Sequence, residues 1–152
     1  MTVKTDWPDL AGRLVEGEHV LPIRIYFEDT DFSGVVYHAA YLRFMERGRS
    51  DMIRLMGVSH EALANGTYGE PLAFAVRRME IDFFRPAKID DLIEVHTKAV
   101  HAAGARIVLE QAVRLGEADL VTAKVTVVMI NHEGKARRMP ATLRSTLGMP
   151  EE

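Results

Sequence analysis

The side chains best suited to chemistry are concentrated in residues 27–47, FEDTDFSGVVYHAAYLRFMER. Two carboxylates, Asp29 and Asp31, are separated by one residue, and the pair Tyr37–His38 follows shortly after them. A carboxylate can attack an electrophilic carbonyl carbon, or it can deprotonate a water molecule that attacks. An isolated Asp-x-Asp is more often a turn whose carboxylates cap backbone N–H groups, so the neighbouring residues must decide between a turn and a site.

The residues after Asp31 favour a site for acyl transfer. Gly34 permits close approach of the backbone, and a helix is expected to begin near His38. The free N–H groups and the positive dipole end of this helix would face the loop and could polarise a carbonyl oxygen. His38 is a candidate for positioning substrate or water, and Glu46, two helical turns further on, could turn toward the same site.

Two other kinds of site are less compatible with these residues. Asp29, Asp31 and His38 could bind a divalent metal, but there is no HExxH motif, no second histidine four residues from His38 and no cysteine. Ser33 lies in DFSGV and not in the G-x-S-x-G motif of a nucleophilic serine. The sequence therefore predicts no metal site and no serine hydrolase.

A strand followed by one long helix must position these groups. Residues 19–28 alternate between apolar and polar side chains, which is typical of a strand. After Gly34 the apolar residues recur at spacings of three and four, which predicts a helix from about residue 38 that ends at Gly57. Gly48 lowers the helix propensity by about 1 kcal/mol relative to alanine, so we expect a strand to pack closely against the helix there.

The rest of the domain is predicted to be strands. The expected ranges are 72–84, 89–100, 105–115 and 118–130. Five antiparallel strands and one long helix predict an α+β fold in which the sheet curls around the helix. Residues 1–18 are expected to form an N-terminal extension, and residues 19–152 a single domain. Because one helix cannot cover such a sheet, we expect a homodimer or homotetramer.

Arginines that follow two turns are candidates for binding phosphate groups. Arg106 follows the turn at residues 103–104, and Arg137 and Arg138 follow the turn at residues 133–134. Solvation of the surface is the ordinary role of each, and a phosphate-bearing ligand would need two or three of them together. We expect the strand meander to place the two turns at opposite ends, so that they meet at one ligand only through a partner subunit or a curled-back tail.

The composition excludes several other functions. The 152 residues include 19 basic and 22 acidic side chains, a net charge of −3, which does not indicate a nucleic-acid-binding protein. The absence of cysteine excludes disulfides, thiolate metal ligands and a cysteine nucleophile. No uncharged apolar run approaches about 18 residues, so no transmembrane segment is predicted, and a cytoplasmic location is expected.

The stretch RIYFEDTDFSGVVYHAAYLRFMERGRSDMIRLMG resembles the signature of the hotdog-fold acyl-CoA thioesterases of the 4-hydroxybenzoyl-CoA thioesterase type. The resemblance is strong to the small thioesterases associated with the Tol–Pal system of bacteria. The stretch IDFFRPAKIDDLIEV at residues 81–95 is similar to a second block of that family. The likeness covers roughly residues 20–138 and leaves residues 1–18 unexplained.

The resemblance implies hydrolysis of acyl-CoA to a carboxylic acid and CoA, with no metal and no cofactor. Asp31 corresponds to the catalytic carboxylate, and Tyr37 and His38 to the pair whose surroundings hold the thioester carbonyl. The resemblance also implies a five-stranded sheet around a central helix, edge-to-edge dimers and often tetramers. Gly34 and Glu46 are then expected at the substrate, and the arginines near the CoA phosphates. The alternatives are a non-catalytic acyl-thioester-binding or scaffolding protein and, as a minor one, a hotdog dehydratase.

Overall fold

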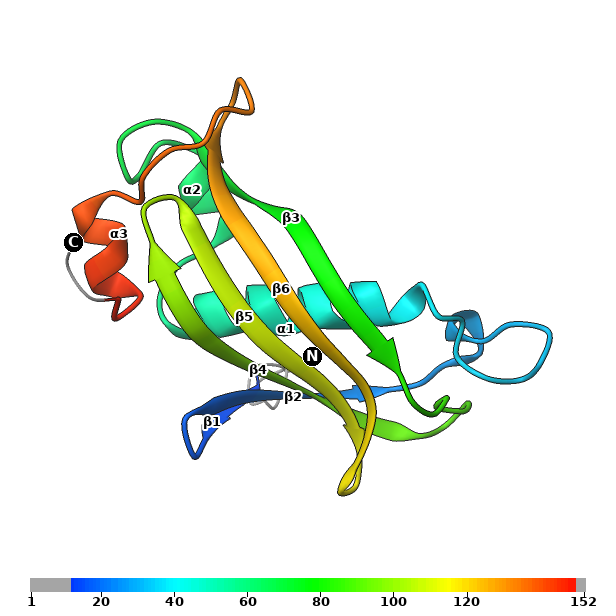
Figure 1. The fold of residues 1–152 in the computed structure, drawn as a ribbon. Coiled ribbons are helices and arrows are strands. Elements are labelled where there is room, and N and C mark those ends of the chain that lie inside the picture. Colours follow the sequence, from blue (N-terminus) through cyan, green and yellow to red (C-terminus); the bar gives the residue numbers. More distant parts are fainter. Residues whose placement is uncertain (1–11, 150–152) are drawn as a thin grey trace, which may run out of the picture.

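One curved antiparallel sheet wraps around the long helix α1 in the computed structural model, which describes residues 12–149 (Figure 1). The sheet order is β1-β2-β4-β5-β6-β3. In chain order the elements are β1 (Arg13–Val15), β2 (Glu18–Arg24), a 3₁₀ turn (Phe27–Asp29), α1 (Ala40–Leu55), α2 (His60–Ala64), β3 (Leu72–Phe83), β4 (Leu92–Ala103), β5 (Arg106–Leu115), β6 (Ala118–Asn131) and α3 (Ala141–Thr146). The expected α+β architecture around a central helix is therefore confirmed.

The sheet has six strands and not the expected five. The additional strand is β1, which pairs antiparallel with β2 through Arg13 opposite Val20. It lies inside the range expected to be an extension, so residues 13–18 of that range join the sheet, while residues 1–11 lie outside the described residues. All three side chains of β1 are exposed, so the strand carries no apolar alternation by which the sequence could have indicated it.

Helix α1 provides the main layer against the sheet. Its inward face includes the fully buried Phe44 and Met45. A Cβ atom at Gly48 would lie 2.8 Å from Val95 Cγ1 and 3.0 Å from Thr97 Oγ1, which confirms that β4 packs closely against the helix at this position. A larger side chain at Gly48 would force the helix away from the sheet.

Buried hydrogen bonds to Asp51 fasten the first two strands to α1. Asp51 Oδ2 accepts hydrogen bonds from His19 Nε2 at 2.7 Å and from the Gly12 N–H at 2.6 Å. His19 has no exposed surface, so its imidazole cannot bond to solvent and relies on this carboxylate as a hydrogen-bond partner. The spacing of four between Arg47 and Asp51 is that of a surface pair on a helix, but the side chain of Asp51 is buried and binds His19 instead.

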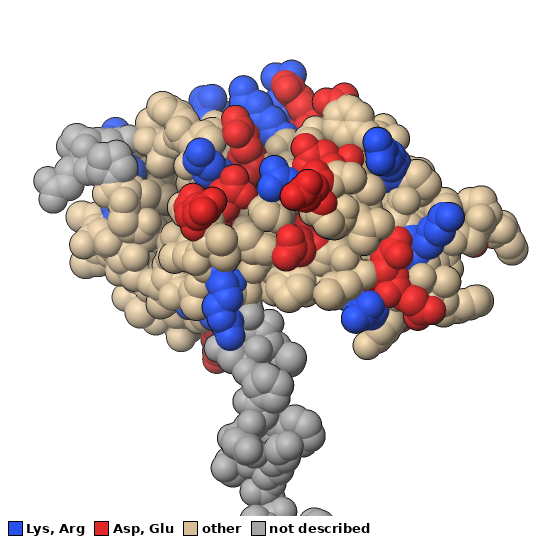
Figure 2. All heavy atoms as spheres, turned by 90° about the horizontal axis from the view of Figure 1, so that it is seen from below, with Lys and Arg blue, Asp and Glu red and all other residues tan. Residues whose placement is uncertain are grey.

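The two edges of the sheet differ. At one edge β1 has three residues, whereas at the other edge β3 has twelve and, among the strands of residues 12–149, pairs with β6 alone. An exposed long edge strand offers unpaired N–H and C=O groups to another chain. On the face seen in Figure 2, acidic and basic side chains are intermingled. Between residues 12 and 149, no helix is long and apolar enough to cross a membrane.

Candidate active site

Asp29 holds the two ends of the loop between β2 and α1 together. Its Oδ2 accepts the N–H of Tyr26 at 2.9 Å, and its backbone oxygen accepts the N–H of Tyr37 at 2.9 Å. The side chain is buried, with Arg43 Nη2 at 4.0 Å from Oδ1. The first carboxylate of the Asp-x-Asp pair therefore shapes the loop.

Asp31 lies at the exposed tip of the same loop. Its Oδ1 accepts hydrogen bonds from the Ser33 hydroxyl and, at 2.8 Å, from the Ser33 N–H. The bond from the Ser33 hydroxyl has the larger effect. Both bonds hold the pKa of the Asp31 carboxyl below its ordinary value because they stabilise the charged form. Gly34, with φ of +81°, closes the turn by donating its N–H to the backbone oxygen of Asp31 at 3.0 Å. Asp31 is thus presented as an ionised carboxylate at neutral pH.

The start of α1 faces this loop, but it begins at Ala40, two residues later than expected. No side chain caps the helix at Ala39, so N–H groups of its first turn have no side-chain acceptor. The N–H of Tyr37 is already bound to the Asp29 backbone oxygen, so it is not a donor for a substrate carbonyl. The N–H of Ala40 donates to the Tyr37 backbone oxygen at 2.8 Å, so the candidate donors at the helix start are the N–H groups of His38 and Ala39.

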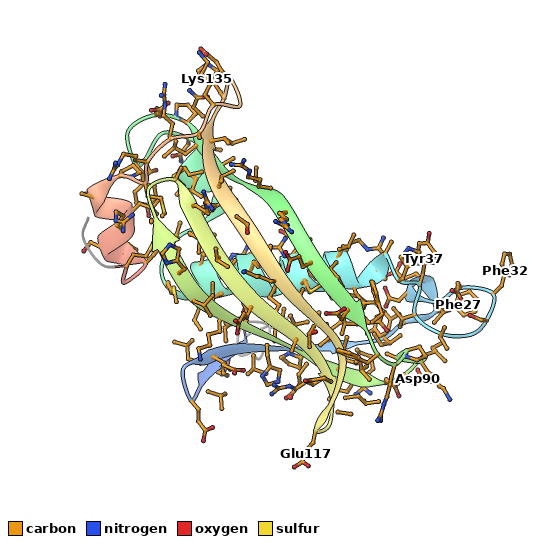
Figure 3. All side chains as sticks on the ribbon, in the orientation of Figure 1. Phe27, Phe32, Tyr37, Asp90, Glu117 and Lys135 are labelled. Carbon is orange, nitrogen blue, oxygen red and sulfur yellow. The ribbon has the colours of Figure 1, made fainter. Side chains whose placement is uncertain are left out.

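Aromatic rings surround the helix start. The ring of His38 lies 4.6 Å from that of Tyr37 and 6.1 Å, edge-on, from that of Phe83 at the end of β3. Figure 3 shows Phe27, Phe32 and Tyr37 gathered at this end of the molecule. Phe27 is 81% exposed, and Phe32 is fully exposed. Exposed aromatic rings around an ionised carboxylate indicate a surface that a substrate or a partner covers.

Glu46 belongs to a different group of side chains, on the second and third turns of α1. The Ser50 hydroxyl donates to Glu46 Oε1 at 2.6 Å and lies 2.8 Å from His60 Nε2. Together with Arg49, these residues line a large cavity. Sequence reasoning did not assign Ser50 or His60. The spacing of four between Glu46 and Ser50 was the signal that they share a helix face.

The arginine candidates lie together at the end of the sheet opposite the Asp31 loop. Arg106, which pairs with Val128, begins β5 beside the end of β6, and the Arg137 N–H donates to the Met129 oxygen at 2.9 Å. The two turns therefore lie at the same end, and the expectation of opposite ends was wrong. Figure 3 shows Lys135, next to these arginines in the chain, far from Phe32.

The partners of these arginines differ. Arg106, Arg137 and Arg138 are all exposed, and Arg137 Nε lies 3.5 Å from Glu70 Oε2. No cluster of three or more metal-ligating side chains exists within residues 12–149.

Comparisons with known proteins identify the family. The thioesterase superfamily matches residues 33–122. The chain belongs to this superfamily. The acyl-CoA thioester hydrolase YbgC of Escherichia coli is 38% identical over 124 residues, which cover 80% of this chain and 90% of the relative. The acyl-CoA thioesterase YbgC of Haemophilus influenzae is 42% identical over 106 residues, 70% of this chain and 74% of the relative.

Solved structures show the same fold. A probable thioesterase from Bartonella henselae superposes with a TM-score of 0.79 at 53% identity and covers 81% of this chain and 99% of its own. The 1,4-dihydroxy-2-naphthoyl-CoA thioesterase of Synechocystis has a TM-score of 0.74 at 24% identity, with 87% and 96% covered, which supports the fold alone. The chain described by this structure has the hotdog fold, as expected, and it is a thioester hydrolase.

Proposed function

We propose that this thioesterase hydrolyses acyl-CoA and uses Asp31 as the nucleophile or as the general base. The observation that carries the proposal is the ionised Asp31 carboxylate, held by Ser33 opposite the uncapped start of α1. The names of the YbgC relatives support acyl-CoA as the substrate. Association with the Tol–Pal system and a cytoplasmic location stay predictions.

The proposed reaction needs a donor for the carbonyl oxygen and a base or nucleophile for the carbonyl carbon. The N–H groups of His38 and Ala39, just before α1, would polarise the thioester carbonyl. In one route Asp31 attacks the carbon, the C–S bond breaks, and water hydrolyses the resulting anhydride. In the other, Asp31 takes a proton from the water that attacks, the C–S bond breaks, and the proton passes to the departing thiolate of CoA. His38, whose ring lies tilted against that of Tyr37 with 4.6 Å between the centroids, would position the thioester or the water.

Release of free thiol from an acyl-CoA panel tests the proposed function. The purified protein should liberate CoA, detected with a thiol reagent, together with an equal amount of carboxylic acid. A turnover number of at least roughly 1 s⁻¹ on the best substrate is the level typical of enzymes. Absence of thiol release across aliphatic and aromatic acyl-CoAs would exclude the proposal.

Removing the Ser33 hydroxyl should move the acid limb of the pH profile. The hydroxyl lowers the pKa of Asp31, so Ser33→Ala raises that pKa, and kcat/KM should begin to fall at a higher pH than in the wild type. The Ser33 N–H bond remains, so the shift is partial. Thr30→Ala is the matched control, because the Thr30 hydroxyl donates to Phe27 instead. An unmoved limb in Ser33→Ala, or an equal shift in both variants, would contradict the assignment.

We further propose that the enzyme is a dimer joined through the β3 edges. The free twelve-residue edge and the exposed aromatic rings support this assembly. Light scattering should give a dimer or a tetramer at micromolar concentration. In an antiparallel pair about a two-fold axis, the Phe83 end of one β3 lies against the Leu72 end of the other. A monodisperse 17.1 kDa monomer with full activity would contradict the assembly.

In that assembly, Asp31 of one protomer approaches the end of the other protomer where the arginines lie. The Asp31 loop lies at the Phe83 end of β3, where His38 is beside Phe83. The other end of β3 is close to the arginines, because Leu72 pairs with Asn131. We expect Arg106→Ala, and Arg137→Ala with Arg138→Ala, to raise KM for acyl-CoA and leave kcat nearly unchanged. A short thioester without the nucleotide should be affected much less. Equal losses on both substrates would mean that the arginines act on structure, and no loss would mean that they only solvate the surface.

A further inference from the structure

A serine, a carboxylate and an imidazole meet on the side of α1 that faces α2. The Ser50 hydroxyl donates to Glu46 Oε1 at 2.6 Å, and its oxygen lies 2.8 Å from His60 Nε2. An ionised carboxylate only accepts hydrogen bonds, so the Ser50 proton lies toward Glu46. His60 then donates its Nε2–H to the Ser50 oxygen. The chemistry proposed at Asp31 uses none of these three side chains.

The fold brings the three side chains together across two helices. Glu46 and Ser50 are four residues apart on α1, so they lie on one face of it. Gly57, with φ of +98°, reverses the chain after α1, and the next residue, Val58, is fully buried. His60 is the first residue of α2 and therefore lies across from the third turn of α1.

The ordinary role of a bond between two helices is to fasten one to the other. Here α2 is held by contacts of its own. The Ser59 hydroxyl caps it by accepting the Ala62 N–H at 3.1 Å, and Leu63 is fully buried. A single hydrogen bond at an exposed position adds little to that packing. The bridge from His60 to Ser50 is therefore open to a chemical role.

The Ser50 oxygen has the surroundings of an activated nucleophile. A serine hydroxyl is weakly nucleophilic until a base within hydrogen-bond distance takes its proton, and Glu46 occupies the position of that base. Ser50 is half-buried, whereas Glu46 and His60 are exposed, so small molecules can reach the group from solvent. Ser50 does not lie in a G-x-S-x-G motif. The folded arrangement, and not a motif, therefore indicates this serine.

A cation lies beside this group. Arg49 is half-buried and lines the same cavity as Ser50. Its Nη1 donates to Gln111 Oε1 at 3.0 Å, and a guanidinium carries several N–H groups, so others can face a second acceptor. Acyl transfer passes through a tetrahedral intermediate with a negatively charged oxygen, which such donors stabilise. A nucleophile, a base and a donor for the oxyanion are thus present in one place.

We propose that Ser50 is the nucleophile of a second hydrolytic site, which cleaves small oxygen esters. Its Oγ attacks the carbonyl carbon while its proton passes to Glu46. The C–O bond to the alcohol then breaks, and the alcohol leaves with that proton. Water attacks the acyl-serine and gives a proton to Glu46, and the carboxylic acid leaves as Ser50 takes that proton back. Arg49 faces the negative oxygen of both intermediates.

A fluorescent alkyl fluorophosphonate tests the nucleophile. The attacking oxygen displaces fluoride from phosphorus, so the label stays on the serine. Tandem mass spectrometry of the wild-type protein should place it on Ser50, and Ser50→Ala should lose it. Glu46→Gln keeps the size of the side chain and should slow labelling at least roughly tenfold, because the base is lost. Ser33→Ala is the matched control and should be labelled as fast as the wild type, since the Ser33 hydroxyl also donates to a carboxylate.

Hydrolysis of p-nitrophenyl acetate measures turnover. Asp31→Asn should release p-nitrophenol at least roughly tenfold faster than Asp31→Asn with Ser50→Ala. A melting curve of each variant establishes that it is folded. Label on Ser33 and not on Ser50, equal labelling of Glu46→Gln and the wild type, or equal p-nitrophenol release by the two Asp31→Asn proteins would overturn the second site. Neither assay contains CoA, so a failure of the proposed acyl-CoA hydrolysis would leave these results standing.

Discussion

Asp31→Asn is expected to lower kcat at least roughly a hundredfold on the best acyl-CoA, the scale associated with loss of a catalytic base or nucleophile. The amide keeps the size of the side chain and can still accept the Ser33 hydrogen bonds, but it cannot attack a carbonyl or take a proton. Because Asp31 is exposed at a loop tip, the thermal unfolding midpoint should change little. Steady-state kinetics and a melting curve on the same preparation check both expectations.

Asp29→Asn is the matched control, since it makes the same chemical change two residues away. Asp29 is buried and accepts the Tyr26 N–H, so the substitution should act mainly through stability and loop order, with a smaller loss in kcat. If Asp31→Asn retains wild-type turnover, or if the two variants lose equal activity, Asp31 is not the catalytic carboxylate.

Asp51→Ala should be the most destabilising of the single substitutions considered, by about 3 kcal/mol in the free energy of unfolding. It removes the acceptor of both the fully buried His19 and the Gly12 N–H. Urea denaturation measures the loss. Asp119→Ala is the control, because Asp119 forms a solvent-exposed pair with Arg114 at 2.7 Å and should contribute less than about 1 kcal/mol. Similar losses in both variants would show that the buried pair is not what joins β2 to α1.

Features encoded by nearby residues could be predicted from the sequence. The alternation of apolar residues identified β2, β4 and β5, the many β-branched residues of 118–130 identified β6, and the change to spacings of three and four identified α1. Gly48 indicated the close contact with β4 because a glycine inside a helix needs a packing reason. Asp31, Tyr37 and His38 lie within eight residues of one another, so their proximity followed from the order of the chain.

Features that depend on distant residues could not be predicted in the same way. The inward turn of Asp51 depends on hydrogen bonds with His19 and Gly12, which are more than thirty residues away. No pattern in the residues around Asp51 predicts that contact. The bridge between Ser50 and His60 joins two helices, and the cavity behind it uses residues from six elements. Strand β1 and helix α3 are too short for a periodic signal.

The error about the arginines has a topological cause. A strand that returns antiparallel brings its end back beside the start of the preceding strand, so the turn before β5 and the turn after β6 share one end of the sheet. The local sequence marks both turns, whereas the end of the sheet at which each turn lies depends on the direction of β6. The three arginines can therefore act on one ligand without a curled-back tail.

The most direct test of the central claim measures CoA binding and acyl-CoA turnover with a single preparation of the wild-type protein. The predicted result is binding of CoA in a titration, together with release of free thiol and an equal amount of carboxylic acid from at least one acyl-CoA. That thiol release should disappear in Asp31→Asn while CoA binding remains. Binding of CoA by the wild type with no thiol released from any acyl-CoA would contradict the account and would show a hotdog protein that binds acyl thioesters without hydrolysing them.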